Sequence, residues 1–156
     1  MKPNIFKDGS INSYRAAYKE SISINSICAR ICGLSDAEFW VLLMLREGHE
    51  TQSEISEQLS ISKQTINSAC KKLIKKGFVR MQTLKNNLRT KKICLTEIGK
   101  NCTDEKINKI AEIEEKVWGS LSENERTTLT GLMNKFNMLM KNNLQNSFAL
   151  ANSAEK

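Results

Sequence analysis

Residues 52–80 read QSEISEQLSISKQTINSACKKLIKKGFVR, and this stretch decides the fold. Its first part, residues 52–59, predicts a short helix. A three-residue turn with an apolar middle follows at 60–62. A second helix is predicted over 63–76, and it ends at Gly77 because glycine accepts the left-handed backbone that closes a helix. Two helices joined by so short a turn make up a helix-turn-helix unit.

The second of these helices has two chemically different faces when its residues are projected at about 100° each. The face expected to pack inward carries Ile66, Ala69, Cys70, Leu73 and Ile74. The outward face carries Gln64, Asn67, Ser68, Lys71, Lys72 and Lys75. Short polar groups that can bond base edges come first, and lysines that can reach phosphates follow. Because a merely solvated helix usually mixes acids with its lysines, this face favours a DNA-reading helix.

A basic window surrounds this helix. Between Glu57 and Glu97 the chain has ten Lys and Arg residues and no Asp or Glu. The whole chain has a net charge of +7, so the window, at +10, leaves the rest of the chain at −3. A patch of one sign on a balanced chain indicates a polyanion site, and nucleic acid is the expected polyanion. The alternative is a lysine-rich face that does nothing but meet solvent.

A hairpin is predicted directly after the second helix. Residues 78–84 and 91–96 have the composition of two short strands, and residues 85–90 form a polar tip between them. Arg89 lies in that tip, where a guanidinium could enter a narrow minor groove; the alternative is an exposed arginine without a role. The hairpin turns the unit into a winged helix-turn-helix.

The remaining chain is predicted to be helical, because the whole sequence has only one proline and seven glycines. Sequences of the capping-box type, a hydroxyl residue with Glu three positions later, begin at Ser35, Thr51 and Ser122. Further helices are expected over 11–32, 36–46, 97–119 and 123–146, with a frayed tail from residue 147. The expected fold class is mainly α with a small β-hairpin wing.

Other classes of protein are disfavoured. The first eight residues contain no apolar run, and the longest apolar stretch, residues 39–45, is far shorter than the ~20 residues of a membrane span. We therefore expect a soluble, cytoplasmic protein with no membrane partner. Five cysteines without a Cys-x-x-Cys pair, and a single histidine, His49, argue against a disulfide scaffold, a zinc site and a catalytic dyad. We expect that the protein is not an enzyme and needs no metal ion or cofactor.

Two stretches resemble the multiple-antibiotic-resistance regulator (MarR) family of bacterial transcription factors. Residues 73–80 read LIKKGFVR, and residues 93–100 read ICLTEIGK, which looks like the Leu-Thr-x-x-Gly motif that starts the family's long dimer helix. The resemblance covers roughly residues 11–144. The wing of the family usually carries Asp-x-Arg; here Arg89 keeps the arginine, whereas Asn87 stands at the position of the Asp.

The resemblance implies a homodimer, and because family members are usually repressors it also implies repression. A symmetric dimer predicts a pseudo-palindromic operator with half-sites about 10 base pairs apart. It implies dimerisation through residues 1–34 and 97–146, DNA binding through 35–96, and a tail at 147–156. Family members are commonly released from DNA by a small aromatic effector. The candidate pocket residues here are Tyr14, Tyr18 and Trp40, and ordinary packing is the alternative for each.

The expected DNA contacts fall into three groups. Base edges in the major groove would be read by Gln64, Thr65, Asn67, Ser68 and Lys71. Phosphates would be held by Ser62, Lys63, Lys72, Lys75 and Lys91. The wing would use Lys85, Asn87 and Arg89.

Two alternative functions remain open from the sequence. One is a thiol-based redox regulator using Cys28, Cys32 or Cys70, although buried packing is the ordinary role of such cysteines. The other is an architectural protein that coats DNA without regard to its sequence, using the same basic face.

Overall fold

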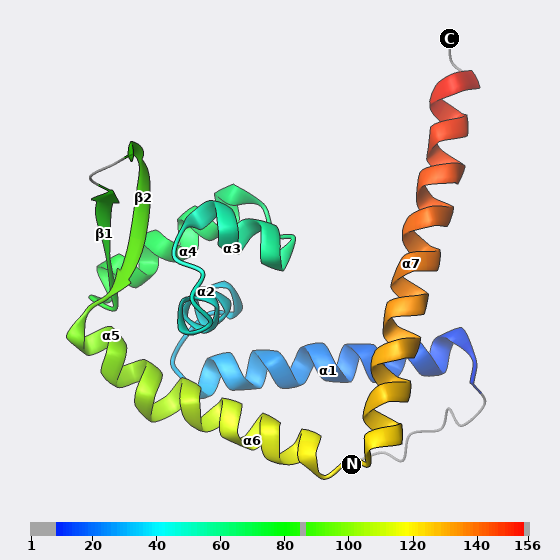
Figure 1. The fold of residues 1–156 in the computed structure, drawn as a ribbon, viewed down its shortest axis with the longest axis horizontal. Helices are drawn as coiled ribbons and strands as arrows, with labels where there is room; N and C mark the ends of the chain where they lie inside the picture. Colours follow the sequence, from blue (N-terminus) through cyan, green and yellow to red (C-terminus); the bar gives the residue numbers. More distant parts are fainter. Residues whose placement is uncertain (1–8, 85–86, 155–156) are drawn as a thin grey trace. The chain divides into compact units, whose positions relative to one another are not determined.

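The structure is a computed structural model that describes the backbone of residues 9–84 and 87–154 and the side chains of residues 9–83 and 91–148. Figure 1 shows the described elements in chain order. They are α1 (Ile11–Ile31), α2 (Asp36–Arg46), α3 (Gln52–Leu59), α4 (Lys63–Lys75), β1 (Val79–Leu84), β2 (Asn87–Leu95), α5 (Glu97–Cys102), η1 (Thr103–Ile107), α6 (Asn108–Gly119) and α7 (Glu123–Ala154). This order confirms the mainly α class with a two-stranded hairpin.

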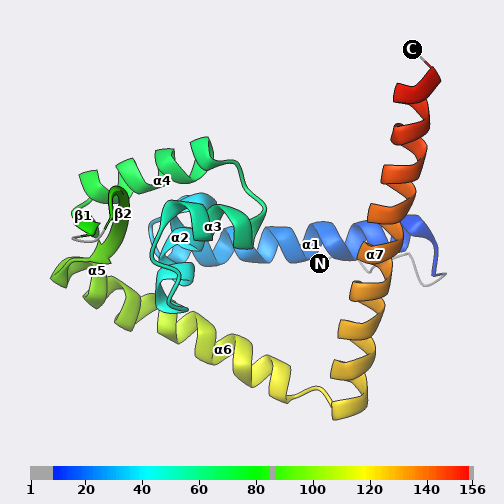
Figure 2. The same cartoon turned by 45° about the horizontal axis from the view of Figure 1, so that its top comes forward.

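The chain divides into two compact units, residues 1–111 and residues 112–156. The first unit holds the core, and α2 is at its centre, in contact with α1, α4, η1 and β2. Figure 2 shows α2 with α3 and α4 beside it. The largest fully buried side chains of the unit come from five elements, α2, α3, α4, β2 and η1. They are Val41, Leu42, Ile55, Ile66, Cys70, Leu73, Ile93 and Ile107. The sequence therefore located the centre of the core correctly at the apolar run of α2.

The helix boundaries follow from local capping. All three expected capping boxes form: Glu38 accepts from the Ser35 backbone N–H, Glu54 from that of Thr51, and Glu125 from that of Ser122, at 2.7, 2.9 and 2.8 Å. Gly33 follows α1 and Gly77 follows α4 with φ of +71° and +74°. A residue with a Cβ would be strained at both positions, so these glycines end the two helices.

The hairpin differs from the prediction in two respects. The second strand begins at Asn87 rather than at residue 91, so residues 87–90 extend β2 instead of forming a turn. β2 also pairs on its other side with the loop before α3, through a bridge from Lys92 to Thr51 and a bond of 2.7 Å from the Ile93 N–H to the Glu50 carbonyl. This third segment holds the wing on the helical core.

The region 97–119 is not one regular helix as expected. Residues 103–107 form a turn of π-helix, η1, between α5 and α6. There the buried Thr103 hydroxyl donates to the Gly99 carbonyl at 2.9 Å, while Ile107 is fully buried. A wider π turn brings both side chains to the core side of the helix.

The last helix is longer than expected. α7 continues to Ala154 instead of ending near residue 146, so the prediction of a frayed tail from residue 147 was wrong for the backbone. No glycine or proline occurs in residues 147–154, and nothing in this composition stops a helix.

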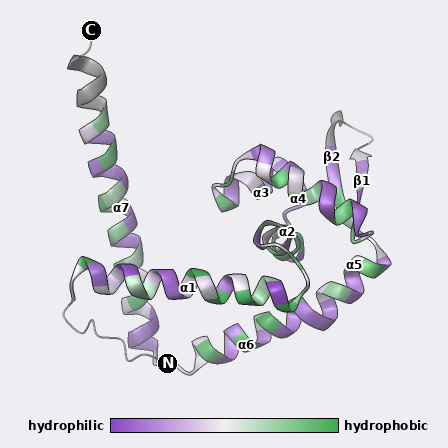
Figure 3. Ribbon diagram, turned by 180° about the vertical axis from the view of Figure 1, so that it is seen from behind, coloured by the Kyte–Doolittle hydropathy of each residue, from purple (hydrophilic) through white to green (hydrophobic). Residues whose placement is uncertain are grey.

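Both units carry apolar side chains that their own chain leaves uncovered, as the hydropathy colouring of α1 and α7 in Figure 3 illustrates. On α1 the exposed large apolar residues are Ile11, Tyr18, Ile22, Ile24, Ile27 and Ile31. On α7 they are Leu129, Leu132, Met138, Leu139, Met140, Leu144 and Phe148. Long rows of this kind are unusual on the surface of a monomer.

Candidate nucleic-acid interface

The turn before α4 is fixed by short hydroxyl contacts. Ser60 has a left-handed backbone with φ of +53°, which reverses the chain after α3. The Ser56 hydroxyl donates to the Ile61 carbonyl at 2.7 Å. Ser62 caps α4 by accepting from the Thr65 N–H at 3.2 Å, and the two hydroxyls lie 2.8 Å apart. These bonds set the direction in which the first turn of α4 leaves the core.

The inward face of α4 is as predicted except at its end. Ile66, Ala69, Cys70 and Leu73 are at most 3% exposed. Ile74 was expected to be buried but is 43% exposed, which corrects the prediction. Counted from Ile66 at about 100° per residue, Ile74 lies about 80° from the centre of the inward face, at its edge.

The outward face is accessible along the length of α4. Side chains of Lys63, Gln64, Thr65, Ser68, Lys71, Lys72 and Lys75 are exposed, and Asn67 is half-buried. A hollow of about 310 Å³ lies between this face and the first turn of α2, lined by Ser35, Ala37, Gln64, Thr65, Ser68, Ala69 and Lys72. One helix thus brings together the polar side chains expected to read bases and most of the lysines expected to hold phosphate.

The cations of the basic window differ in their surroundings. Among the described residues, two of them are ion-paired: Lys76 with Glu38 at 3.0 Å, and Lys92 with Glu50. The hydrogen bond to Glu50 raises the pKa of Lys92. Side chains of Lys63, Lys71, Lys72, Lys75 and Lys91 make no ion pair within the described part of the chain. These five amines are therefore available to a polyanion.

The tip of the wing is only partly described. Lys85 lies outside the described residues. Asn87 and Arg89 lie in β2, but their side chains are outside the described set. The roles expected for these three residues therefore stay predictions. Lys91, beside them in β2, pairs across the hairpin with Thr83 and is exposed.

The motif Leu-Thr-x-x-Gly lies at the junction between the wing and α5. The Thr96 N–H donates to the Phe78 carbonyl at 3.0 Å, and the Thr96 hydroxyl lies within hydrogen-bonding distance of the Gly77 carbonyl. The same hydroxyl caps α5 by accepting from the Gly99 N–H at 3.1 Å. Gly99 then packs directly on the backbone of Phe78. The motif thus joins the ends of α4, β2 and α5 in one contact.

The cysteines proposed for redox chemistry are free thiols. Cys32 and Cys70 are buried and Cys28 is half-buried. Burial raises the pKa of Cys32, and it raises the pKa of Cys70 to about 11. Since the thiolate is the reactive form, this environment makes Cys70 a poor nucleophile near neutral pH.

A direct test of this conclusion is alkylation. At pH 8, Cys70 in the folded protein should react with iodoacetamide about 100-fold more slowly than in the urea-unfolded chain, because a pKa two units higher leaves about one hundredth of the thiolate. Mass spectrometry of the Cys70 peptide gives both rates. Equal rates would restore Cys70 as a candidate redox sensor.

The residues expected to line an effector pocket lie on two elements. Tyr14 and Tyr18 stack on α1 with ring centroids 6.1 Å apart, and Trp40 is half-buried on α2 next to Phe39. The tyrosines and the tryptophan belong to different helices, and a pocket common to all three stays a prediction.

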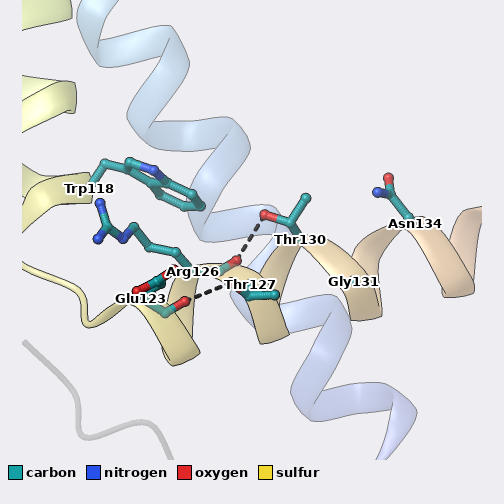
Figure 4. A pocket seen from close by; sticks show the side chains of 7 residues that line it. All are labelled: Trp118, Glu123, Arg126, Thr127, Thr130, Gly131 and Asn134. Atoms are coloured by element: carbon teal, nitrogen blue, oxygen red, sulfur yellow. Dashed lines mark hydrogen bonds between the residues drawn. The ribbon is translucent and has the colours of Figure 1, made fainter.

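A separate hollow of about 650 Å³ lies in the second unit. Figure 4 shows the Trp118 ring and side chains from the first turns of α7 around it. Its lining consists of Trp118, Glu123, Arg126, Thr127, Thr130, Gly131 and Asn134. Two of its hydroxyls are engaged by their own helix: Thr127 donates to the Glu123 carbonyl and Thr130 to that of Arg126, at 2.8 and 2.9 Å. No pattern in residues 118–134 predicted this hollow.

The described residues lack the features of two other classes of protein. They contain no group of three or more His, Cys, Asp or Glu side chains that could hold a metal ion. None of the described helices is both long and apolar enough to cross a membrane.

Comparison with known proteins gives the same fold. Structures similar to this chain include NMB1585, a MarR family regulator from Neisseria meningitidis (TM-score 0.74, 22% identity, 88% of this chain and 97% of that one). Bordetella bronchiseptica BpsR, studied for regulation of its DNA binding by 6-hydroxynicotinic acid, is similar at a TM-score of 0.65 and 19% identity, over 85% of this chain and 96% of its own. A mutant of S. aureus MepR bound to oligodeoxyribonucleotide has a TM-score of 0.52 and 18% identity, over 81% and 94% of the two chains.

Sequence comparison is more limited in extent. A search of curated proteins gave no match. A family model described as MarR family matches residues 33–85, which run from the end of α1 to the hairpin and include all of α4. MarR family proteins are DNA-binding transcription regulators and not enzymes. Residues 33–85 therefore match the MarR family model, and the chain has the fold of solved structures that include MarR family regulators.

Proposed function

We propose that the protein is a homodimeric transcription regulator, and specifically a repressor, that reads a pseudo-palindromic operator. The observation that carries this proposal is the outward face of α4, which is exposed, rich in amides, hydroxyls and amines, and free of carboxylates. Such a face attracts a duplex through its phosphates and offers donors and acceptors to base edges. A protein with this role acts where the chromosome is, which fits the cytoplasmic location expected from the sequence.

The proposed contacts follow the position of each side chain along α4. Base edges in the major groove would be met by residues from the first turn of α4 to the start of its third: Gln64, Thr65, Asn67, Ser68 and Lys71. Phosphates would bind Ser62, Lys63, Lys72, Lys75 and Lys91, whose polar groups are exposed. The wing residues Lys85, Asn87 and Arg89 would enter the minor groove, in keeping with the hairpin's place directly after α4.

Pairing of two chains is supported by the uncovered apolar residues of α1 and α7. Burying large aliphatic and aromatic side chains gives about 25 cal/mol for each Å² removed from water, and a second copy with the same rows can cover them. Two reading helices related by a two-fold axis would then contact half-sites about 10 base pairs apart. Sedimentation equilibrium at micromolar concentration should give twice the chain mass; a single-chain mass would contradict the pairing.

An aromatic effector is a further part of the proposal. BpsR, whose fold is similar, is described with DNA binding regulated by 6-hydroxynicotinic acid. In this chain the side chains proposed to line a pocket are Tyr14, Tyr18 and Trp40. In a Trp118→Phe variant Trp40 is the single tryptophan, so its fluorescence during titration with small aromatic acids would report binding near Trp40.

The decisive experiment compares affinities for selected and unrelated DNA. Duplexes are selected from a random library with the purified protein, and the best is titrated against a scrambled duplex at 0.15 M salt, a salt level near the physiological one. A regulator should favour the selected duplex by roughly 10³-fold or more. A ratio near one would instead support the architectural alternative, in which the basic face binds any duplex.

Substitutions on the outward face should relax specificity. Asn67→Ala or Ser68→Ala removes groups that can bond base edges, so discrimination at one or two base positions should fall by about 1–3 kcal/mol. Competition titrations with duplexes altered at single positions measure this loss. Lys72→Ala serves as the contrast: it should weaken all duplexes alike and reduce the salt slope by about one unit per site.

A further inference from the structure

One amine of the basic window lies in a place unlike the others. The Lys76 Nζ donates to the Gly33 carbonyl at 3.1 Å, directly after α1, and to Glu38 Oε2 at 3.1 Å in the first turn of α2. It is also 3.0 Å from Glu38 Oε1. Lys76 itself is the C-cap of α4. One ammonium therefore joins the end of α1, the start of α2 and the end of α4.

The carboxylate at this point is almost completely buried, with a side chain 3% exposed. Burial alone would raise the pKa of Glu38, but the Ser35 backbone N–H and the Lys76 ammonium outweigh it and hold the pKa below its usual range. Glu38 Oε1 accepts no hydrogen bond among the described residues, and the Lys76 ammonium, 3.0 Å away, is its ion-pair partner. The pair therefore stays charged at neutral pH and its geometry is closely set.

The preceding residue provides a contrast. Lys75 has the same charge and lies about 100° away around the helix, on the exposed outward side, with no ion pair within the described residues. Lys75 can move its amine toward a phosphate, whereas Lys76 would have to leave a buried carboxylate to do so. Leaving that carboxylate unpaired is unfavourable, because a buried charge without a partner is strongly destabilising.

We propose that Lys76 is a positioning residue, which ties the end of α4 to the junction of α1 and α2 and does not bind DNA. The inference rests on the proposed function, in which α1 takes part in pairing and α4 reads DNA. The bond then fixes the distance from the pairing helix to the reading helix, and so the separation of half-sites that the dimer accepts. Buried ion pairs add little stability compared with apolar packing, and their best-attested use is to fix one geometry.

The test compares Lys76→Met with its neighbour Lys75→Met and the unchanged protein. Each is titrated with the selected operator and with operators whose half-sites are one base pair closer or farther apart, over a range of salt. Lys75→Met should weaken all three duplexes alike and lower the salt slope by about 0.9 per subunit. Lys76→Met should leave the salt slope unchanged and reduce the preference for the original spacing at least threefold.

Two further variants separate position from stability. Glu38→Gln keeps one acceptor oxygen for the cap of α2 but removes the charge, and it should reduce the spacing preference as Lys76→Met does. Lys76→Arg keeps the charge and should retain the preference. If Lys76→Met does not fold, Glu38→Gln and Lys76→Arg still test the proposal. For each of them the measured quantity is the ratio of the affinities for operators of different spacing, rather than a single affinity.

Lysine acetylation of the unchanged protein gives an independent measurement. Bound operator should protect Lys71, Lys72 and Lys75 from acetic anhydride and leave the slower rate of Lys76 unaltered. The inference is overturned if DNA protects Lys76 like Lys75, if Lys76→Met lowers the salt slope, or if only the melting temperature changes. Failure of the unchanged protein to bind any duplex at low salt would overturn the proposed function itself, and this inference with it.

Discussion

Replacing Gly99 by alanine should lower the free energy of unfolding by about 3 kcal/mol, because the new methyl group has no room. A Cβ built on Gly99 lies 1.9 Å from the Phe78 carbonyl oxygen and 2.8 Å from its carbonyl carbon. Both atoms belong to the backbone, which cannot turn aside as a side chain would. The substitution must therefore push α5 away from the start of the hairpin and weaken the bonds of Thr96. Urea unfolding followed by circular dichroism measures the effect.

Gly119→Ala is the matched control. Gly119 is the last residue of α6, and a Cβ built there meets nothing within 4 Å. Alanine in a helix is favoured over glycine by up to about 1 kcal/mol, so this variant should be as stable as the unchanged protein or slightly more stable. Equal midpoints for the two variants would show that the contact of Gly99 with Phe78 contributes nothing to stability.

The second large effect concerns DNA affinity. Changing Lys71, Lys72 and Lys75 together to glutamine should reduce affinity for the selected operator by more than about 100-fold near 0.15 M salt. Each lysine that meets a phosphate releases about 0.9 of a counterion, so the loss of Lys72 and Lys75 from both subunits of a dimer should reduce the magnitude of the salt slope by about 3.6. All three side chains are exposed and outside the core, and folding should be unaffected. Fluorescence anisotropy at several salt concentrations measures both quantities.

A variant with the same loss of charge elsewhere provides the comparison. Lys109, Lys116 and Lys135 are exposed and lie outside the basic window. Changing these three to glutamine lowers the net charge equally but should alter affinity only slightly, since screening limits action beyond about 8 Å at physiological salt. A loss as large as that of the first variant would mean that total charge, rather than the outward face of α4, governs binding.

Much of the fold could be predicted because its signals are local. The capping boxes at Ser35, Thr51 and Ser122 mark where helices begin, and Gly33 and Gly77 mark where helices end. Each of these signals is contained in four residues or fewer. For the same reason α2 and α3 were predicted with their observed bounds.

The predictions of the fold failed where contacts between distant segments, or the geometry of the backbone, determine the structure. The π turn at residues 103–107 depends on burying Thr103 and Ile107 together, which no pattern in those five residues reveals. The bridge from Thr51 to Lys92 joins residues far apart in sequence, so the extra strand-like segment could not be seen locally.

The same distinction applies to the candidate site. The exposed side of α4 followed from helical period alone, and only Ile74, at the edge of the inward face, was misplaced. Which lysine is engaged in an ion pair could not be predicted, because Glu38 is 38 residues from Lys76 in the chain. The basic window therefore looked uniform in sequence, whereas its amines have distinct surroundings in the structure.

The carboxylate-free surface of α4 has a consequence for how the protein would be distributed in a cell. A surface that attracts phosphates regardless of base sequence binds every stretch of the chromosome weakly, and such stretches outnumber an operator by about a millionfold or more. Most copies would then reside on ordinary DNA, exchanging by sliding and short hops. That reservoir would buffer the supply of unbound protein, so occupancy of an operator would change little when synthesis fluctuates.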